Sequence, residues 1–175
     1  MPYPSGLFNP TEDINIERVL DGLSTALEQS PTGLGEANQV QIEFGVAVND
    51  STDPVNLLQD GTLVINKDGL YRLKISLLYG REVGGGTSEL RFRVLINGVQ
   101  AGQTVGVDID SAKISLPFED EAWVNLTTGL LITYEIMRES SGADTGGLIS
   151  VPVTSATAPS WAQTTCAAIR VERWV

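Results

Sequence analysis

The chain has 175 residues, of which 42% are hydrophobic and 19% charged, and its net charge at pH 7 is −11. This length is typical of one domain that buries about 70% of the surface its unfolded form exposes, and the composition argues against wholesale disorder. No apolar run approaches the ~18 residues of a membrane span, and no basic-then-apolar leader opens the chain. We therefore expect a globular protein with no membrane insertion.

The side chains that most enzymes use are missing. The chain has no histidine and a single cysteine, Cys166. Without histidine there is no Ser-His-Asp or Cys-His catalysis and no histidine metal site. A lone cysteine forms neither an intrachain disulfide nor a cysteine metal cluster, and the glycines at 84–86 lack the lysine of a phosphate-binding loop. We expect no catalytic residue, no cofactor and no bound metal.

Carboxylates offer the one other route to catalysis or metal binding. Asp108 and Asp110 share a face if their segment is a strand, and we interpret Glu119, Asp120 and Glu121 as an acidic turn. Such oxygen ligands bind Ca²⁺, and paired carboxylates hydrolyse glycosidic bonds. Acids in turns chiefly keep strand ends soluble, and they have little reason for the perturbed pKa of a general acid. We interpret both groups as solvated.

The acidity is concentrated in the first third of the chain. Residues 1–60 hold ten acids and one base, a net charge of −9, whereas residues 61–175 hold twelve acids and ten bases, a net charge of −2. This distribution argues against a nucleic-acid partner, because phosphate binding needs Lys and Arg. Two interpretations stay open: a solvated, solubilising face, or an electrostatic match to a basic docking surface.

Residues 1–13 are predicted to form an extended arm. Three prolines and a glycine prevent a helix there. Tyr3, Leu7 and Phe8 are costly to leave in water, so the arm either lies against another chain or is a frayed terminus.

Residues 14–38 are predicted to hold an amphipathic helix over 14–29 and a linker. Asp13 is a suitable N-cap, and the segment 30–33 (Ser-Pro-Thr-Gly) ends the helix. A helix of about four turns is not stable alone in water, so its apolar stripe packs on its own domain or on copies of itself around a symmetry axis. The stripe recurs at three- and four-residue spacing and consists of Ile16, Val19, Leu20, Leu23, Ala26 and Leu27.

From residue 39 onward, period-two alternation predicts strands. The clearest are 69–80 and 90–96, which we expect to be joined around 84–86 in one large antiparallel sheet, with a tight turn at Asn97-Gly98. About eight to ten strands predict an all-β antiparallel sandwich of jelly-roll type over residues 39–175, with long exposed loops at 139–147 and 154–165. The other predicted strands are 40–48, 62–66, 112–116, 122–126, 130–137, 148–153 and 167–175.

The order of motifs over residues 39–175 resembles the C1q/TNF-like jelly roll. Gly-Leu-Tyr-Arg-Leu enters one strand, Phe-Arg-Val-Leu-Ile-Asn-Gly follows, and Cys-Ala-Ala-Ile-Arg-Val-Glu-Arg-Trp-Val comes last. This order is similar to the family's rhythm of G-x-Y, then v-x-v-N-G, then l-x-v-x-r. The family usually has Gly-Asp before the late strand, where this chain has Thr128-Gly129-Leu130. The resemblance implies a homotrimer whose inner faces meet at a threefold axis.

The resemblance also implies a function. Similar domains form compact knobs on the heads, fibres and tails of bacterial viruses, and this small acidic chain looks most like those. We expect a non-enzymatic bacteriophage virion structural protein: a trimeric capsid decoration protein, assembled in the host cytoplasm, that binds and stabilises the head. The alternative is a receptor-binding knob of a tail or fibre that recognises host surface glycans or proteins.

The expected partners are other copies of the chain and capsid or tail proteins of the particle. Trp161, in a loop of small residues, either anchors a partner or covers the open end of the barrel. The expected partner-binding residues are Tyr3, Leu7, Phe8, Ile16, Leu20, Leu23, Leu27 and Trp161.

Overall fold

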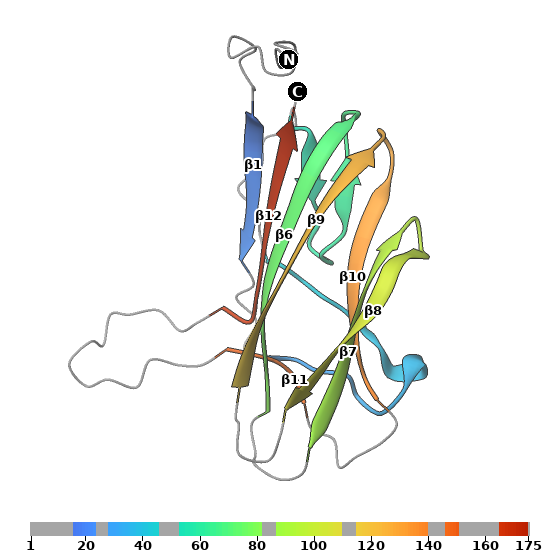
Figure 1. Cartoon of the computed structure of the whole chain (residues 1–175), viewed down its shortest axis with the longest axis vertical. Helices are drawn as coiled ribbons and strands as arrows, with labels where there is room; N and C mark the ends of the chain where they lie inside the picture. The colour runs from blue at the N-terminus through green and yellow to red at the C-terminus, as the bar shows by residue number, and fades with distance from the viewer. Residues whose placement is uncertain are drawn as a thin grey trace, which may run out of the picture.

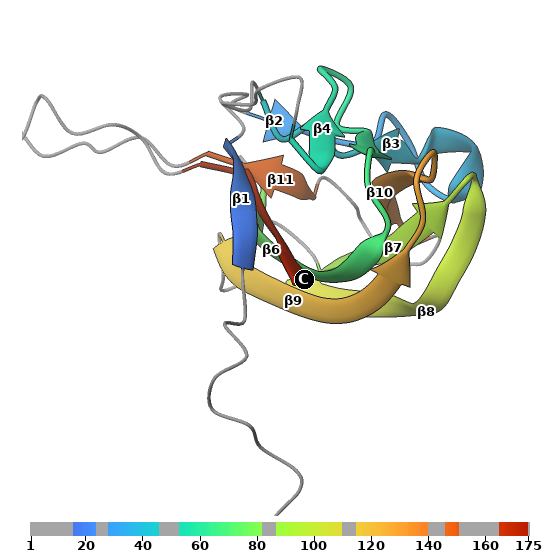
Figure 2. The same cartoon turned by 90° about the horizontal axis from the view of Figure 1, so that it is seen from above.

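The strands form two antiparallel sheets that face each other (Figures 1 and 2). The computed structural model describes residues 16–23, 28–45, 53–81, 87–109, 115–139, 146–150 and 165–174. Helical structure in these residues is limited to the 3-10 turn η1 (Glu36–Asn38), and none of their helices is long and apolar enough to cross a membrane. The strands are β1 (Ile16–Leu23), β2 (Glu28–Gln29), β3 (Val40–Gln41), β4 (Val55–Leu57), β5 (Leu63–Ile65), β6 (Gly69–Gly80), β7 (Ser88–Ile96), β8 (Val99–Ile109), β9 (Ser115–Leu126), β10 (Leu131–Arg138), β11 (Gly147–Ile149) and β12 (Ala167–Trp174).

The first sheet is built around β6. On one side β6 pairs along its whole length with β9, from Gly69 opposite Leu126 to Gly80 opposite Ser115. On its other side it pairs with β12 and, further along, with β11. β1 pairs with β12 and β2 with β11, so β9 is an edge strand of this sheet.

The second sheet is built around β10, which pairs with β7 on one side and with β5 and β3 on the other. β4 lies beyond β5, and β8 lies beyond β7 as an edge strand. The turn between β7 and β8 is the predicted one: Asn97 and Gly98 have φ angles of 50° and 76°, as in the tight turns that match strand twist. The two edge strands β8 and β9 lie on the same side of the sandwich (Figure 2).

Burial follows the alternation predicted from the sequence. In β6 every second side chain from Tyr71 to Tyr79 is buried, and the side chains between them are on the outer face. The other predicted strands that the structure describes correspond mainly to β3, β5, β7, β10, β11 and β12. The sandwich architecture of the prediction is confirmed. Both sheets contribute to an aromatic cluster in the core, formed by Phe44, Tyr79, Phe92, Phe118 and Tyr134.

The helix predicted over residues 14–29 is wrong. The described parts of this segment are β1 and β2. The register of β1 against β12 shifts between Glu17 and Leu20, which leaves Arg18 and Val19 opposite the single residue Glu172. A β-bulge of this kind adds one residue to a strand and interrupts its alternation. The apolar residues on either side of it are therefore spaced by three or four, as they would be on a helix.

The prediction that strands 69–80 and 90–96 share one sheet is also wrong. β6 belongs to the first sheet and β7 to the second, so the chain crosses from one sheet to the other between them. Alternation shows which face of a strand is buried, but it does not identify the strand's neighbour.

The predicted acidic turn at residues 119–121 lies in the middle of a strand. β9 runs without interruption from Ser115 to Leu126, and its pairing with β6 includes all three acids. Arg72 and Lys74 of β6 form ion pairs with Glu121 and Glu119, which explains how these two carboxylates are accommodated in a strand. The predicted arm over 1–13 and most of the predicted loops 139–147 and 154–165 lie outside the described residues.

Candidate functional site

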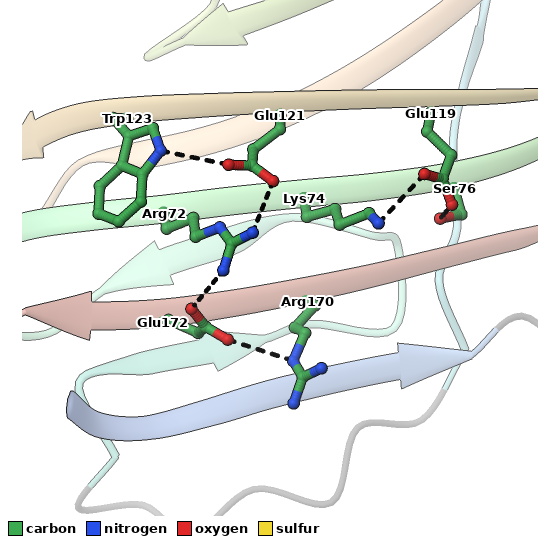
Figure 3. Close-up of polar contacts among 8 residues, drawn as sticks. All are labelled: Arg72, Lys74, Ser76, Glu119, Glu121, Trp123, Arg170 and Glu172. Atoms are coloured by element: carbon green, nitrogen blue, oxygen red, sulfur yellow. Dashed lines mark hydrogen bonds and ion pairs between the residues drawn. The ribbon is translucent and has the colours of Figure 1, made fainter.

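The outer face of β6, β9 and β12 carries a cluster of charged and aromatic side chains (Figure 3). Because β6 lies between the other two strands, their outward side chains form three adjacent rows. We call this cluster the Trp–Arg face. It consists of Leu70, Arg72, Lys74, Ser76, Glu119, Glu121, Trp123, Arg170, Glu172 and Trp174.

Arg72 is the centre of this face. Its Nη2 donates to Oε2 of Glu121 at 2.8 Å, and its Nη1 donates to Oε2 of Glu172 at 3.2 Å, so one guanidinium joins all three strands. Its Cζ lies 5.7 Å from the centre of the Trp123 ring, which is within cation–π range. The hydrogen bonds with Glu121 and Glu172 raise the pKa of Arg72, and the bond from Arg72 lowers the pKa of Glu121.

Glu119 forms the second part of the network. Its carboxylate lies 3.1 Å from Nζ of Lys74 and accepts a hydrogen bond from Oγ of Ser76 at 3.1 Å. These bonds lower the pKa of Glu119, and the bond from Lys74 has the largest effect. A general acid of a hydrolase needs a raised carboxyl pKa, so the pairing shifts Glu119 and Glu121 away from that role.

Two tryptophans meet across β6. The rings of Trp123 and Trp174 make an edge contact, with 5.1 Å between their centres and 62° between their planes. Nε1 of Trp123 donates to Glu121 at 3.2 Å, yet 48% of Trp123 is exposed. Nε1 of Trp174 is buried and has no hydrogen-bond partner in the part of the chain that the structure describes, an arrangement that costs roughly 1–3 kcal/mol. An exposed, oriented ring of this size is typical of a binding surface.

The Trp–Arg face is balanced in charge although the whole chain carries a net charge of −11. Exposed ion pairs contribute only about 0.2–1 kcal/mol each to stability. Their larger effect here is to hold the Arg and Trp side chains in fixed orientations. Trp and Arg are enriched in protein–protein interfaces, and the paired Lys and Glu side chains of this face suit the polar rim of such an interface. Its three basic residues are Arg72, Lys74 and Arg170, and its three acidic residues are Glu119, Glu121 and Glu172.

Comparison with known proteins shows similarity in structure only. No protein-family model matches the chain, and no curated protein matches it. The chain is similar to the globular domain of zebrafish complement 1qA protein, with 12% identity and a TM-score of 0.47 over 90% of this chain and 96% of that one. It is also similar to murine APRIL, with 10% identity and a TM-score of 0.48 over 89% of this chain and 97% of that one.

Both of these structures are C1q/TNF-like domains, the group that the sequence resembles. Likenesses of this size concern the arrangement of strands and say nothing of partners or activity.

The residues predicted to bind partners are not part of the Trp–Arg face. Tyr3, Leu7, Phe8, Leu27 and Trp161 lie outside the described residues. The other three are in β1, where the backbone register places Ile16 opposite Trp174, Leu20 opposite Val171 and Leu23 opposite Ala168.

Sequence reasoning noted Trp123 and Trp174 but did not bring them together. The signal that could have found the Trp–Arg face is the shared alternation of three strands, in which Arg72, Trp123 and Glu172 occupy outward positions. This shared alternation identifies a common face only when β6 is known to lie between β9 and β12.

The acidic residues considered as metal ligands are separated. Glu119 and Glu121 point to the outer face of β9, whereas Asp120 lines a cavity on the inner side. Asp108 lies 3.9 Å from Nη1 of Arg91, and Asp110 is outside the described residues. Within those residues, no group of three His, Cys, Asp or Glu is arranged to hold a metal ion.

A pocket of about 130 Å³ lies on the outer face of the second sheet, next to Arg93. The guanidinium of Arg93 already contacts three partners, with distances of 2.7 Å to Glu135, 3.1 Å to Glu36 and 2.7 Å to Gln39. The hydrogen bonds to Glu135, which has the largest effect, and to Glu36 raise the pKa of Arg93. None of the residues that line this pocket is an exposed large aromatic side chain like Trp123, so the Trp–Arg face is the better candidate.

Proposed function

We propose that this protein is a non-enzymatic structural protein whose Trp–Arg face joins copies of the chain into a homotrimer, and that the trimer decorates the head surface of a bacteriophage. The observation that carries the assembly function is the exposed Trp123 ring, held by Trp174 and Arg72 on a face without net charge. Two acidic copies approach each other with least repulsion through such a face.

The virion location has different support. It rests on the sequence resemblance to phage knob domains, on the apolar residues of the arm over 1–13, and on the charge of −9 over residues 1–60. An acidic leading segment suits attachment to a basic patch on a capsid, and closed symmetry covers apolar surface that one chain leaves in water.

The assembly function is tested by the variant Trp123→Ala. Native mass spectrometry of the wild type at micromolar concentration should give three times the chain mass of 18.7 kDa. Truncating a central interface tryptophan typically costs 2 kcal/mol or more, so Trp123→Ala should weaken association at least about 30-fold. The matched control is Val99→Ala, which removes an apolar side chain that is 71% exposed on β8.

The control should keep the wild-type mass, and both variants should keep the circular dichroism spectrum of the wild type. A wild-type mass of 18.7 kDa, or a trimer that Trp123→Ala leaves unchanged, would contradict the assembly function.

The virion function is tested with phage particles that lack the protein. We expect such particles to assemble but to lose resistance to heat and to low ionic strength, because a ligand that binds only the assembled shell stabilises it by mass action. Adding back the purified trimer should restore both. Particles with normal heat resistance and lost adsorption to host cells would point instead to receptor binding.

A further inference from the structure

A cavity of about 380 Å³ opens between the edge strands β8 and β9. This volume is within the range of roughly 300–1,000 Å³ found for small-molecule sites. The cavity lies between the two sheets, so it is separate from the Trp–Arg face on the outside of the first sheet. Figure 2 shows the two strands on the same side of the sandwich.

The lining of this cavity is mostly apolar, and its polar side chains are Gln103 and Asp120. Its deepest residues, Leu73, Phe92 and Ile132, belong to the buried core. Facing sheets normally fill the space between them with interdigitated side chains. Here the inward positions nearest the edge carry short side chains, which leave the space open: Val94, Ala101, Val105, Ala122 and Val124.

One carboxylate lines this apolar cavity. Asp120 lies opposite Ile75 in the β6–β9 register, on the inner face of β9, and is half-buried. It has no hydrogen bond or ion pair among the residues that the structure describes. Arg72 and Lys74 of the neighbouring strand point to the outer face, where they bind Glu121 and Glu119.

Tyr79 and Tyr134, two ionisable side chains on which Asp120 acts electrostatically, carry no positive charge that could pair with it. Burial, with a further contribution from Asp120, raises the pKa of both Tyr79 and Tyr134, so both phenols stay neutral. A carboxylate that is half-removed from water without a partner is unfavourable. A cation whose apolar part filled the space would relieve this cost and cover the apolar walls.

We propose that the cavity between β8 and β9 binds a small organic cation, with an ammonium group against Asp120 and an apolar chain or ring between the sheets. The carboxylate of Asp120 favours a ligand with a positive charge, and the apolar walls favour an apolar chain or ring attached to that charge. This site is additional to the assembly function, since it uses a different surface of the chain.

The test measures binding of 2-phenylethylammonium to the ¹⁵N-labelled full chain by NMR titration, beside 2-phenylethanol as the neutral probe. The cation should shift the amide resonances of β8 and β9 and should bind more tightly than the alcohol. Asp120→Asn should weaken the cation about tenfold, the loss expected for one charged contact, and leave the alcohol unchanged. Asp108→Asn, an acid on the outer side of β8, should change neither affinity.

A second variant tests the apolar walls. Ala122→Leu adds three carbons to a side chain that lines the cavity and should weaken both probes, while the resonances of this variant outside β8 and β9 stay those of a folded protein. The proposal is overturned if Asp120→Asn binds the cation as the wild type does, or if the alcohol binds equally well. It is also overturned if a second copy fills the cavity, in which case the affinity for the probe falls as protein concentration rises and Asp120→Asn changes the mass of the assembly.

Discussion

Gly61 occupies a position in the turn between β4 and β5 that only glycine fits. Its φ is +85°, and a Cβ there would meet the carbonyl oxygen and carbon of Ile42. The backbone of Ile42 is itself held in the second sheet, since its N–H donates to the carbonyl of Tyr134 at 2.8 Å. The added Cβ and the Ile42 carbonyl cannot separate without a cost in free energy, because residue 61 is fixed in a left-handed turn and Ile42 is hydrogen-bonded to the second sheet.

We therefore expect Gly61→Ala to lower the free energy of unfolding by roughly 2–4 kcal/mol. The matched control is Gly129→Ala, where φ is +89° but nothing lies within 4 Å of the added Cβ. This variant has only the unfavourable φ, so its free energy of unfolding should fall by about 1 kcal/mol. Urea denaturation of both variants measures the difference, and equal losses would show that the contact with Ile42 is relieved at no cost.

At the scale of elements, the sequence predicts a strand well when its alternation is unbroken. β6 has the predicted bounds, 69–80, because every second residue is apolar and the turn residues at both ends are clear. β1 was missed because its bulge changes the spacing of the apolar residues. The sequence divides β9 in two because three consecutive acids suggest a turn. Arg72 and Lys74 of the neighbouring strand, which pair with Glu121 and Glu119, explain why two of these acids can lie in a strand.

The Trp–Arg face could not be predicted from the sequence either, because its prediction needs the order of the strands. Each of its residues is visible in the sequence, and the alternation correctly places Arg72 and Lys74 on an outward face. What the sequence lacks is the order of strands, which decides that Trp123 and Trp174 meet above β6. Strand order depends on which long-range pairs form, and these leave no local pattern.

The ion pairs between β6 and β9 should make the free energy of unfolding depend on pH. Pairing with Lys74 and Arg72 lowers the pKa of Glu119 and Glu121 below the ordinary value of 4.5. A lowered folded-state pKa means that the contribution is fully present above pH 4.5 and is lost as pH falls through the lowered value. Urea denaturation at pH 7 and pH 3 should show a smaller difference between the two pH values for Glu121→Gln than for the wild type. An identical difference would mean that this ion pair contributes nothing.

For the whole molecule, the proposed functions assign separate surfaces to self-association and to attachment. The first described strand begins at Ile16, after the predicted arm, so removing residues 1–13 takes no described backbone from either sheet. We expect this deletion to leave the melting temperature and the trimeric state unchanged and to abolish attachment to the particle. Sedimentation with particles lacking the protein measures attachment. Attachment with unchanged affinity would show that the arm is dispensable.

The place of β12 in the first sheet has a consequence for how the chain folds as it is made. β1 is synthesised early, but the strand that pairs with it, β12, is the last strand described, and β12 separates β1 from β6. Until the ribosome has released residue 174, β1 lacks the strand with which it pairs in the described structure, and β6 keeps one side largely open. Pairing across such a sequence distance is slow, because the loop must close before any contact forms. A nascent chain cut short before β12 would leave exposed the edges of β1 and β6 that β12 pairs with, and such edges invite aggregation.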